Sequence, residues 1–153
     1  MAMGQDPEMV KAIVSAVKAA VDVPVIPKLT PNVDRIEDIG LAALEAGADG
    51  LCAINTVGPG YTERPGHPVL RKGMGGMSGS GGLPTALKCI RALKTITDKP
   101  IVGCGGLSTA DDCRAAISAG ASIIGVGSAL SGMDTEDMNA YFRQLQTDLD
   151  KGT

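Results

Sequence analysis

Short apolar runs alternate with amphipathic stretches along this chain, and the two patterns follow one another in a regular order. The predicted strands are mostly apolar and cover residues 23–29, 50–55, 100–104 and 122–127. The predicted helices carry apolar side chains at helical spacing and cover residues 34–46, 83–97, 110–119 and 135–149. A further helix begins at residues 6–8, where an Asp cap precedes a Pro in the first turn. The pattern predicts a series of βα units.

An internal repeat supports this interpretation. Residues 43–48, Ala-Leu-Glu-Ala-Gly-Ala, return 73 positions later as residues 116–121, Ala-Ile-Ser-Ala-Gly-Ala. Two βα units of roughly 36 residues fit this offset, and repeated βα units imply parallel strands with right-handed crossovers. We therefore expect an α/β fold of the (β/α)8 TIM-barrel type. Residues 1–153 would form a single domain of about four βα units, the C-terminal half of such a barrel.

One segment interrupts the alternation. Residues 58–82 are rich in Gly and Pro. The segment is too rich in Gly for a helix and longer than a loop that only connects two elements, so we expect a functional loop. The sequence carries no β-hairpin signal, which argues against an antiparallel sheet. His67 lies in this loop between Gly66 and Pro68, and we expect it to be solvated rather than catalytic or metal-binding.

Composition and charge exclude several classes of partner. The formal net charge of -3 gives no basic surface for nucleic acid or an anionic membrane. The sequence has no run of roughly 20 apolar residues and no basic-then-apolar signal pattern at its start, so we expect a cytoplasmic protein. The cysteines show no metal-ligand spacing and are expected to be reduced, buried, structural thiols without a metal: Cys52, Cys89, Cys104 and Cys113.

Glycine-rich segments follow the last two predicted strands. In TIM barrels the loops after strands seven and eight commonly bind a phosphate group. Residues 103–106 read Gly-Cys-Gly-Gly and residues 125–128 read Gly-Val-Gly-Ser. Glycines let backbone N–H groups approach phosphate oxygens, and the Ser hydroxyl is a further donor. The pair favours a phosphate site, with simple tight turns as the alternative.

Polar groups end the first two predicted strands. Lys28 follows an apolar run, where a charge without a partner would be costly, so we expect it to face an anion at the barrel mouth. The alternative is a lysine that extends into solvent. Asn55 and Thr56 end the next strand, and their amide and hydroxyl suit a planar heterocycle with imide or carboxylate groups. Asn is also a common turn residue, which leaves a structural role open.

Five strings make the pattern specific to one family. They are residues 24–32 (PVIPKLTPN), 53–56 (AINT), 75–79 (GGMSG), 105–106 (GG) and 127–128 (GS). In this order and spacing the chain resembles the class 1 dihydroorotate dehydrogenases, particularly the 1B type. Small departures are Ser128, where Thr is common, and Gly82-Leu83-Pro84 in place of a more usual Ile-Lys-Pro.

The resemblance implies an FMN-dependent oxidation of dihydroorotate to orotate in pyrimidine biosynthesis. It assigns FMN contacts to Lys28, Ile54, Gly79, Gly105, Gly106, Gly127 and Ser128. It places Asn55 and Thr56 at the dihydroorotate or orotate ring. The family's general base is a Cys or Ser on a loop expected upstream of this chain, so no catalytic base is assigned here, and Cys52 and Cys104 are not expected to replace it.

The resemblance also implies partners. An N-terminal half would complete the barrel, and an iron–sulfur/FAD electron-transfer subunit would accept the electrons in the 1B type. Two other functions remain open: the FMN domain of a dihydropyrimidine dehydrogenase-like enzyme, and a non-catalytic half-barrel that associates with itself. A half-barrel has two edge strands, so a homo-oligomer is expected.

Overall fold

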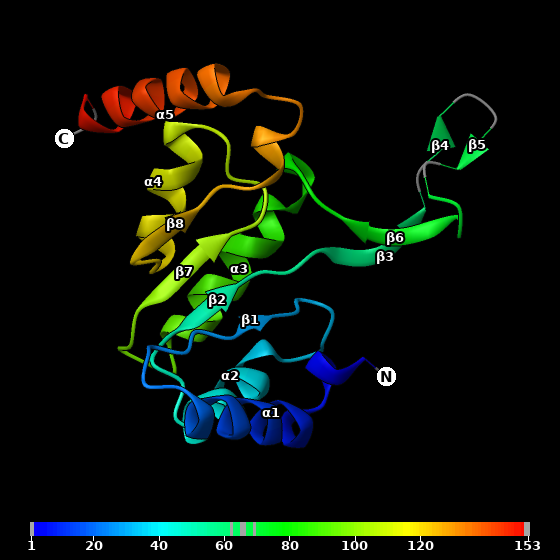
Figure 1. The fold of residues 1–153 in the computed structure, drawn as a ribbon, viewed down its shortest axis with the longest axis vertical. Coiled ribbons are helices and arrows are strands. Elements are labelled where there is room, and N and C mark those ends of the chain that lie inside the picture. Colours follow the sequence, from blue (N-terminus) through cyan, green and yellow to red (C-terminus); the bar gives the residue numbers. More distant parts are fainter. Residues whose placement is uncertain (1, 62, 65–66, 69, 152–153) are drawn as a thin grey trace.

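A four-stranded parallel sheet lies at the centre of the molecule (Figure 1). The computed structural model describes residues 2–61, 63–64, 67–68 and 70–151. The strands run in the order β1 (Lys28–Leu29), β2 (Leu51–Ala53), β7 (Ile101–Cys104) and β8 (Ile123–Gly125). Every neighbouring pair is parallel, as predicted from the βα repeat. The sheet is part of a TIM-type barrel with four of its strands.

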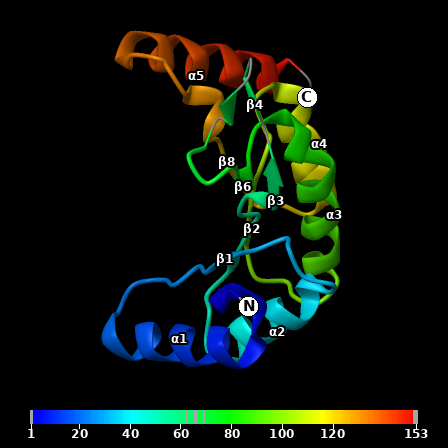
Figure 2. The ribbon, with the colours of Figure 1, turned by 90° about the vertical axis from the view of Figure 1, so that its right-hand side faces the viewer.

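The helices form one outer layer over this sheet. They are α1 (Pro7–Ala20), α2 (Ile36–Glu45), α3 (Leu83–Lys94), α4 (Ala110–Ala119) and α5 (Thr135–Asp150). Short 3-10 turns cover Met3–Gln5, Ser80–Gly82 and Ser128–Leu130. Each helix packs against the next one in the chain, so the layer follows the curvature of the sheet (Figure 2). No helix among the described residues is long and apolar enough to cross a membrane.

The core between the helices and the sheet is built from small and aliphatic side chains. Its largest fully buried members are Leu51, Ile90, Leu93, Ile101 and Cys113. Glycines allow the layers to approach closely. A Cβ at Gly103 of β7 would lie 2.8 Å from the Cβ of Ala121 and 3.0 Å from Cδ1 of Ile90. The high Gly and Ala content therefore reflects close helix-on-sheet packing.

The sequence repeat corresponds to two equivalent helix ends. Gly47 follows α2 with φ at +92°, and Gly120 follows α4 with φ at +114°. In both places the next residue's N–H donates to a carbonyl five residues back: Ala48 to Ala43 at 3.1 Å, and Ala121 to Ala116 at 3.0 Å. Each Gly turns the chain from helix into the following strand, as helix-ending glycines do.

The first strand is shorter than predicted. The sequence predicted a strand over 23–29, but only Lys28–Leu29 is strand in the structure. Pro24 and Pro27 have no N–H to donate to a neighbouring strand. The preceding segment still accepts two hydrogen bonds through its carbonyls, from Asp49 to Val25 at 2.9 Å and from Cys52 to Pro27 at 2.9 Å. It therefore runs beside β2 without a complete ladder.

The expectation of no antiparallel pairing is wrong. β3 (Val57–Tyr61) pairs antiparallel with β6 (Met74–Met77), and β4 (Glu63–Arg64) pairs with β5 (His67–Pro68). The β3–β6 ribbon projects from the sheet (Figure 1). Its strands lack an alternating pattern because glycines occupy positions where a side chain would overlap the facing strand, as at Gly60 against Met77. Residues 62, 65, 66 and 69 of the predicted loop lie outside the described residues.

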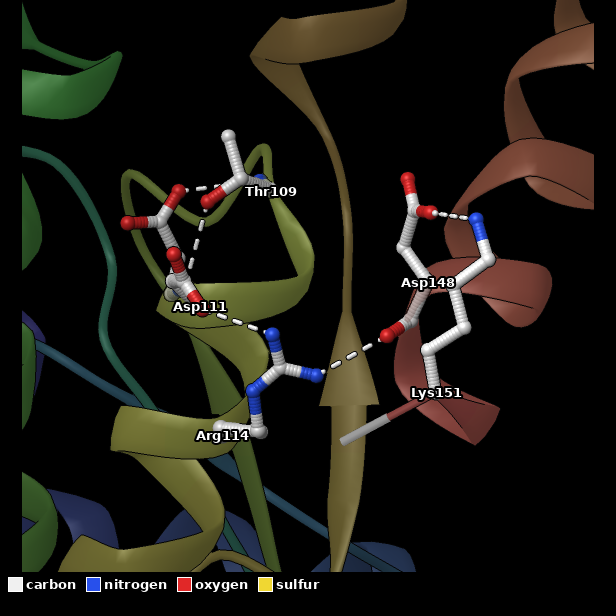
Figure 3. Close-up of polar contacts among 6 residues, drawn as sticks. Thr109, Asp111, Arg114, Asp148 and Lys151 are labelled. Atoms are coloured by element: carbon white, nitrogen blue, oxygen red, sulfur yellow. Dashed lines mark hydrogen bonds and ion pairs between the residues drawn. The ribbon is translucent and has the colours of Figure 1, made fainter. Parts of the chain in front are cut away.

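Arg114 forms the polar link between helices α4 and α5. Figure 3 shows Arg114 of α4 between two acceptors: Asp111 Oδ1 at 2.6 Å on its own helix and the backbone carbonyl of Asp148 on α5 at 3.0 Å. Lys151 donates to the Asp148 carboxylate at 3.1 Å. At the other side of the interface, Tyr141 Oη donates to the Ser108 carbonyl at 2.8 Å. These contacts position α5 beside the loop that follows β7.

The helix-ending glycines generate a stability prediction. Replacing Gly47 with Ala should lower the free energy of unfolding by about 1 to 2 kcal/mol, because an L-residue is strained at positive φ. A Cβ at Gly47 meets only Lys18 Cγ, at 3.8 Å, so steric overlap does not contribute. Urea denaturation measures the difference.

Gly4→Ala is the matched control for this substitution. Its Cβ would meet Thr30 Cγ2 at an ordinary 3.6 Å, and its φ is not in the left-handed region. We expect its stability to stay within about 0.5 kcal/mol of the unsubstituted protein. Equal stabilities of the Gly47→Ala and Gly4→Ala variants would contradict the assigned role of Gly47.

Candidate functional site

A cavity of about 300 Å³ opens at the carboxyl ends of the four parallel strands. In parallel sheets all strands end at the same edge, which is where α/β folds generally carry their sites. The nine residues proposed from the sequence all line this cavity: Lys28, Ile54, Asn55, Thr56, Gly79, Gly105, Gly106, Gly127 and Ser128. The structure thus brings together residues that are up to 100 positions apart in the chain.

Each strand delivers its own part of the lining. Lys28 of β1 is paired in register with Cys52 of β2, so both side chains lie on the same face of the sheet. Ile54 continues β2 and donates its N–H to the Cys104 carbonyl at 2.8 Å. This bond links the end of β2 to the end of β7, directly before Gly105. The loops after β7 and β8 therefore lie next to the 54–56 segment.

The glycines of the β7 loop are required by the protein itself. Gly105 has φ at +114°, and a Cβ there would lie 2.8 Å from Cγ1 of the buried Ile54. A Cβ at Gly106, where φ is +85°, would lie 2.7 Å from both the Gly79 carbonyl oxygen and the Leu83 nitrogen. The loop after β7 is packed against the start of α3, which explains why Gly79 and Gly106 line one cavity.

The glycine of the β8 loop is in a different environment. A Cβ at Gly127 would meet no atom within 4 Å, and its φ of −132° is outside the left-handed region. Gly127 and Ser128 are both exposed at the cavity. Close packing within the protein therefore does not explain Gly127, whereas it does explain Gly105 and Gly106.

Asn32 organises the polar end of the cavity, a role that the sequence reasoning missed. Its Nδ2 donates to the Thr56 carbonyl at 3.1 Å, and its Oδ1 accepts from the Gly58 N–H at 2.8 Å. Asn55 Oδ1 accepts from the Thr56 N–H at 2.8 Å, so the Asn55 Nδ2 amide is not used by that bond. One feature of the sequence could have indicated this role: Asn32 follows the first predicted strand, in a loop at the same edge of the sheet as the end of the next strand.

The prediction that all four cysteines are buried is correct for two of them and wrong for the other two. Cys89 and Cys113 are buried in helices, as predicted, and burial raises the pKa of each thiol. Cys52 and Cys104 are only half-buried and line the cavity. Their side chains lie on the face of the sheet opposite the helix layer, on the cavity side. All four are free thiols in the structure.

Lys28 and the two cavity thiols form one electrostatic group. Lys28 is exposed at the cavity, where its ammonium is a smaller influence on both thiols: it adds to the lowering of the pKa of Cys104 and partly opposes the raising of the pKa of Cys52. The hydrogen bond between the two sulfurs is the larger influence, and it lowers the pKa of Cys104. The same bond, together with burial, raises the pKa of Cys52. His67 lies on β5 and is exposed, in keeping with a solvated residue.

Comparison with known proteins identifies the family. The family model for dihydroorotate dehydrogenase matches residues 1–149. Over 131 residues the chain is 47% identical to the protein named dihydroorotate dehydrogenase B (NAD(+)), catalytic subunit, of Methanocella arvoryzae, covering 85% of this chain and 44% of that protein. The protein of the same name from Streptococcus pneumoniae serotype 4 is 46% identical over 128 residues, covering 83% and 41% respectively.

A solved structure shows the same fold. The crystal structure of a dihydroorotate dehydrogenase from Eimeria tenella, in complex with ferulenol, superimposes with a TM-score of 0.73 at 22% identity. The match covers 95% of this chain and 44% of that one, so the chain spans less than half the length of the relatives. The family model and the two named relatives indicate the same family. The chain belongs to the dihydroorotate dehydrogenase family.

Proposed function

We propose that this chain is the FMN-binding part of a dihydroorotate dehydrogenase that oxidises dihydroorotate to orotate in pyrimidine biosynthesis. The single observation that carries the proposal is the cavity at the strand ends, because it is lined by all nine residues proposed from the sequence. The names of the relatives support the same activity. The proposed protein is therefore an FMN-dependent oxidoreductase of the cytoplasm.

The cavity has groups that fit FMN. Gly127 leaves open space beside a strand end, and Gly105, Gly106 and Ser128 provide backbone N–H groups and a hydroxyl near it. We assign the phosphate to these four residues. We assign the ring system to the part of the cavity lined by Lys28, Ile54 and Gly79, where Lys28 supplies the one cation among the lining residues.

The chain's own residues would orient the substrate and stabilise negative charge in the cavity. When bound, FMN supplies the group that accepts a hydride from dihydroorotate. Asn55 and Thr56 would hold the dihydroorotate ring through their amide and hydroxyl, in a loop that Asn32 braces. The Lys28 ammonium would stabilise negative charge at its end of the cavity. We assign the general base to a Cys or Ser of a segment outside this chain.

Partners follow from the relatives. Those relatives are named catalytic subunits, which implies at least one further subunit in their assemblies. For this chain we propose an N-terminal half that pairs with the sheet and an iron–sulfur/FAD subunit that accepts electrons. Within the described residues, β1 and β8 are each hydrogen-bonded on one side only. These edges would pair with further strands, or with a second copy of the chain in a non-catalytic assembly.

The deciding experiment is a titration of the purified protein with FMN, followed by flavin fluorescence. Dihydroorotate is then added anaerobically to the complex, and flavin reduction is observed as bleaching. Dihydrouracil is added to a separate sample as the substrate of the alternative function. Saturable FMN binding supports the proposal, and bleaching by dihydroorotate but not dihydrouracil would show that this chain suffices for the reaction. Bleaching by dihydrouracil alone, or no FMN binding, would contradict the proposed function.

Lys28→Ala should weaken FMN binding by about 10- to 100-fold. The substitution removes a charge-assisted contact, which is generally worth about 1.5 to 3 kcal/mol. The fluorescence titration measures the dissociation constant. Lys88→Ala is the control, because Lys88 is exposed on α3 and does not line the cavity. An unchanged affinity in Lys28→Ala would remove Lys28 from the proposed contacts.

Gly127→Ala should weaken FMN binding by at least about tenfold, because the added methyl would occupy space assigned to the phosphate. Gly105 is less informative, since a side chain there would displace Ile54 whether or not FMN binds. At Gly127 the protein itself leaves room for the methyl group. Gly4→Ala should bind FMN normally, because Gly4 is not among the residues that line the cavity. Equal affinities of the Gly127→Ala and Gly4→Ala variants would argue against the phosphate assignment.

A further inference from the structure

Asn32 has all four of its polar groups paired within the protein. Its backbone N–H donates to Thr30 Oγ1 at 3.2 Å, and its carbonyl accepts from Gln5 Nε2 at 2.7 Å. Its side chain donates from Nδ2 to the Thr56 carbonyl and accepts at Oδ1 from the Gly58 N–H. Because a carbonyl only accepts and an N–H only donates, these partners fix the orientation of the side-chain amide. Asn32 is thus placed to hold other residues rather than to bind a ligand itself.

Thr56 is held from three sides by this part of the chain. Asn32 binds the carbonyl of Thr56, and Asn55 Oδ1 accepts its N–H at 2.8 Å. On the third side, the Thr56 side chain packs against Gly76 of β6, where a Cβ would overlap Thr56 Oγ1 and lie 2.6 Å from Thr56 Cβ. Asn32 also binds Gly58 of β3. The β3–β6 ribbon is therefore attached to the polar end of the cavity through both of its strands.

We infer that Asn32 and Gly76 are positioning residues: together they fix Thr56, and Thr56 in turn fixes which groups of Asn55 face a ligand. Asn55 Oδ1 is occupied by the Thr56 N–H, and Asn55 Nδ2 has no hydrogen-bond partner among the described residues. Asn55 therefore presents amide donors to a ligand with acceptor oxygens, such as a carboxylate or a ring carbonyl. Only the identity of that ligand depends on the proposed function.

These contacts are separate from the residues assigned to FMN. Neither Asn32 nor Gly76 lines the cavity at the strand ends. Ile54, which is assigned to FMN, is placed by its own hydrogen bond to the Cys104 carbonyl and does not need Thr56. Loosening Thr56 should therefore weaken binding of the substrate ring and leave binding of the cofactor unchanged. A general loss of folding would weaken both.

The first test titrates the protein with FMN, and then the FMN complex with orotate, by calorimetry. Asn32→Ala should weaken orotate binding by about tenfold, the size of effect expected from a lost hydrogen bond, and keep the FMN affinity within about twofold. Asn139→Ala is the matched control, because Asn139 is an exposed residue of α5 that does not line the cavity. An unchanged orotate affinity in Asn32→Ala, or an equal loss of FMN and orotate affinity, would overturn the inference.

Gly76→Ala tests the contact with the ribbon. The φ of Gly76 is not in the left-handed region, and the three atoms nearest to an added Cβ all belong to Thr56, so the substitution acts by displacing Thr56. We expect the same selective loss of orotate affinity, whereas Gly81→Ala, whose methyl meets no atom within 4 Å, should bind both ligands normally. Because both residues act through Thr56, the double variant with Asn32→Ala should lose less affinity than the product of the two single losses. A multiplicative loss would contradict the shared role.

Amide hydrogen exchange in the unliganded protein, measured by NMR, tests the same role without a ligand. Asn32→Ala should speed exchange at both Thr56 and Gly58 by about tenfold. Asn32→Asp keeps an oxygen acceptor for the Gly58 N–H but has no donor for the Thr56 carbonyl at neutral pH, so only Thr56 should exchange faster. Absence of orotate binding in the unsubstituted protein would contradict the proposed function, and the exchange rates would then decide the role of Asn32. Unchanged rates at both amides in Asn32→Ala would show that Asn32 does not position Thr56.

Discussion

The parallel pairing of β1, β2, β7 and β8 is the constraint on which the cavity depends. Strands that run in one direction must all end at the same edge, so the loops that follow them meet there. Lys28, the 54–56 segment and the two glycine loops come from four different units of the chain. Reversing any one strand would move its loop to the opposite edge of the sheet.

Close packing decides which glycines serve the fold and which serve the cavity. Gly103 lets β7 approach Ala121 and Ile90, and the next glycines, Gly105 and Gly106, fit the same strand end against Ile54 and the start of α3. Gly127 has no comparable neighbour. The same residue type therefore has two physical uses within one site, and only the distances to surrounding atoms separate them.

Lys28 brings the one positive charge among the residues that line the cavity. As the cation beside the strand ends it suits an anionic group of a bound cofactor, and the same charge lowers the pKa of Cys104. A ligand that neutralises Lys28 would therefore remove one influence that lowers the pKa of Cys104.

The sequence by itself determined the βα series, the helix ends at Gly47 and Gly120, and the glycine loops after the last two strands, because periodicity and glycine-rich loops are local signals. The resemblance to a known family added Ile54 and Gly79 to the proposed cavity residues. Tertiary structure decided the rest. Prolines shortened β1 to Lys28–Leu29, and the β3–β6 ribbon formed where glycine removed any alternation. The role of Asn32 and the contact of Cys52 with Cys104 depend on segments 24 and 52 residues apart. Such contacts exist only after strand pairing has fixed register and face, which no local pattern specifies.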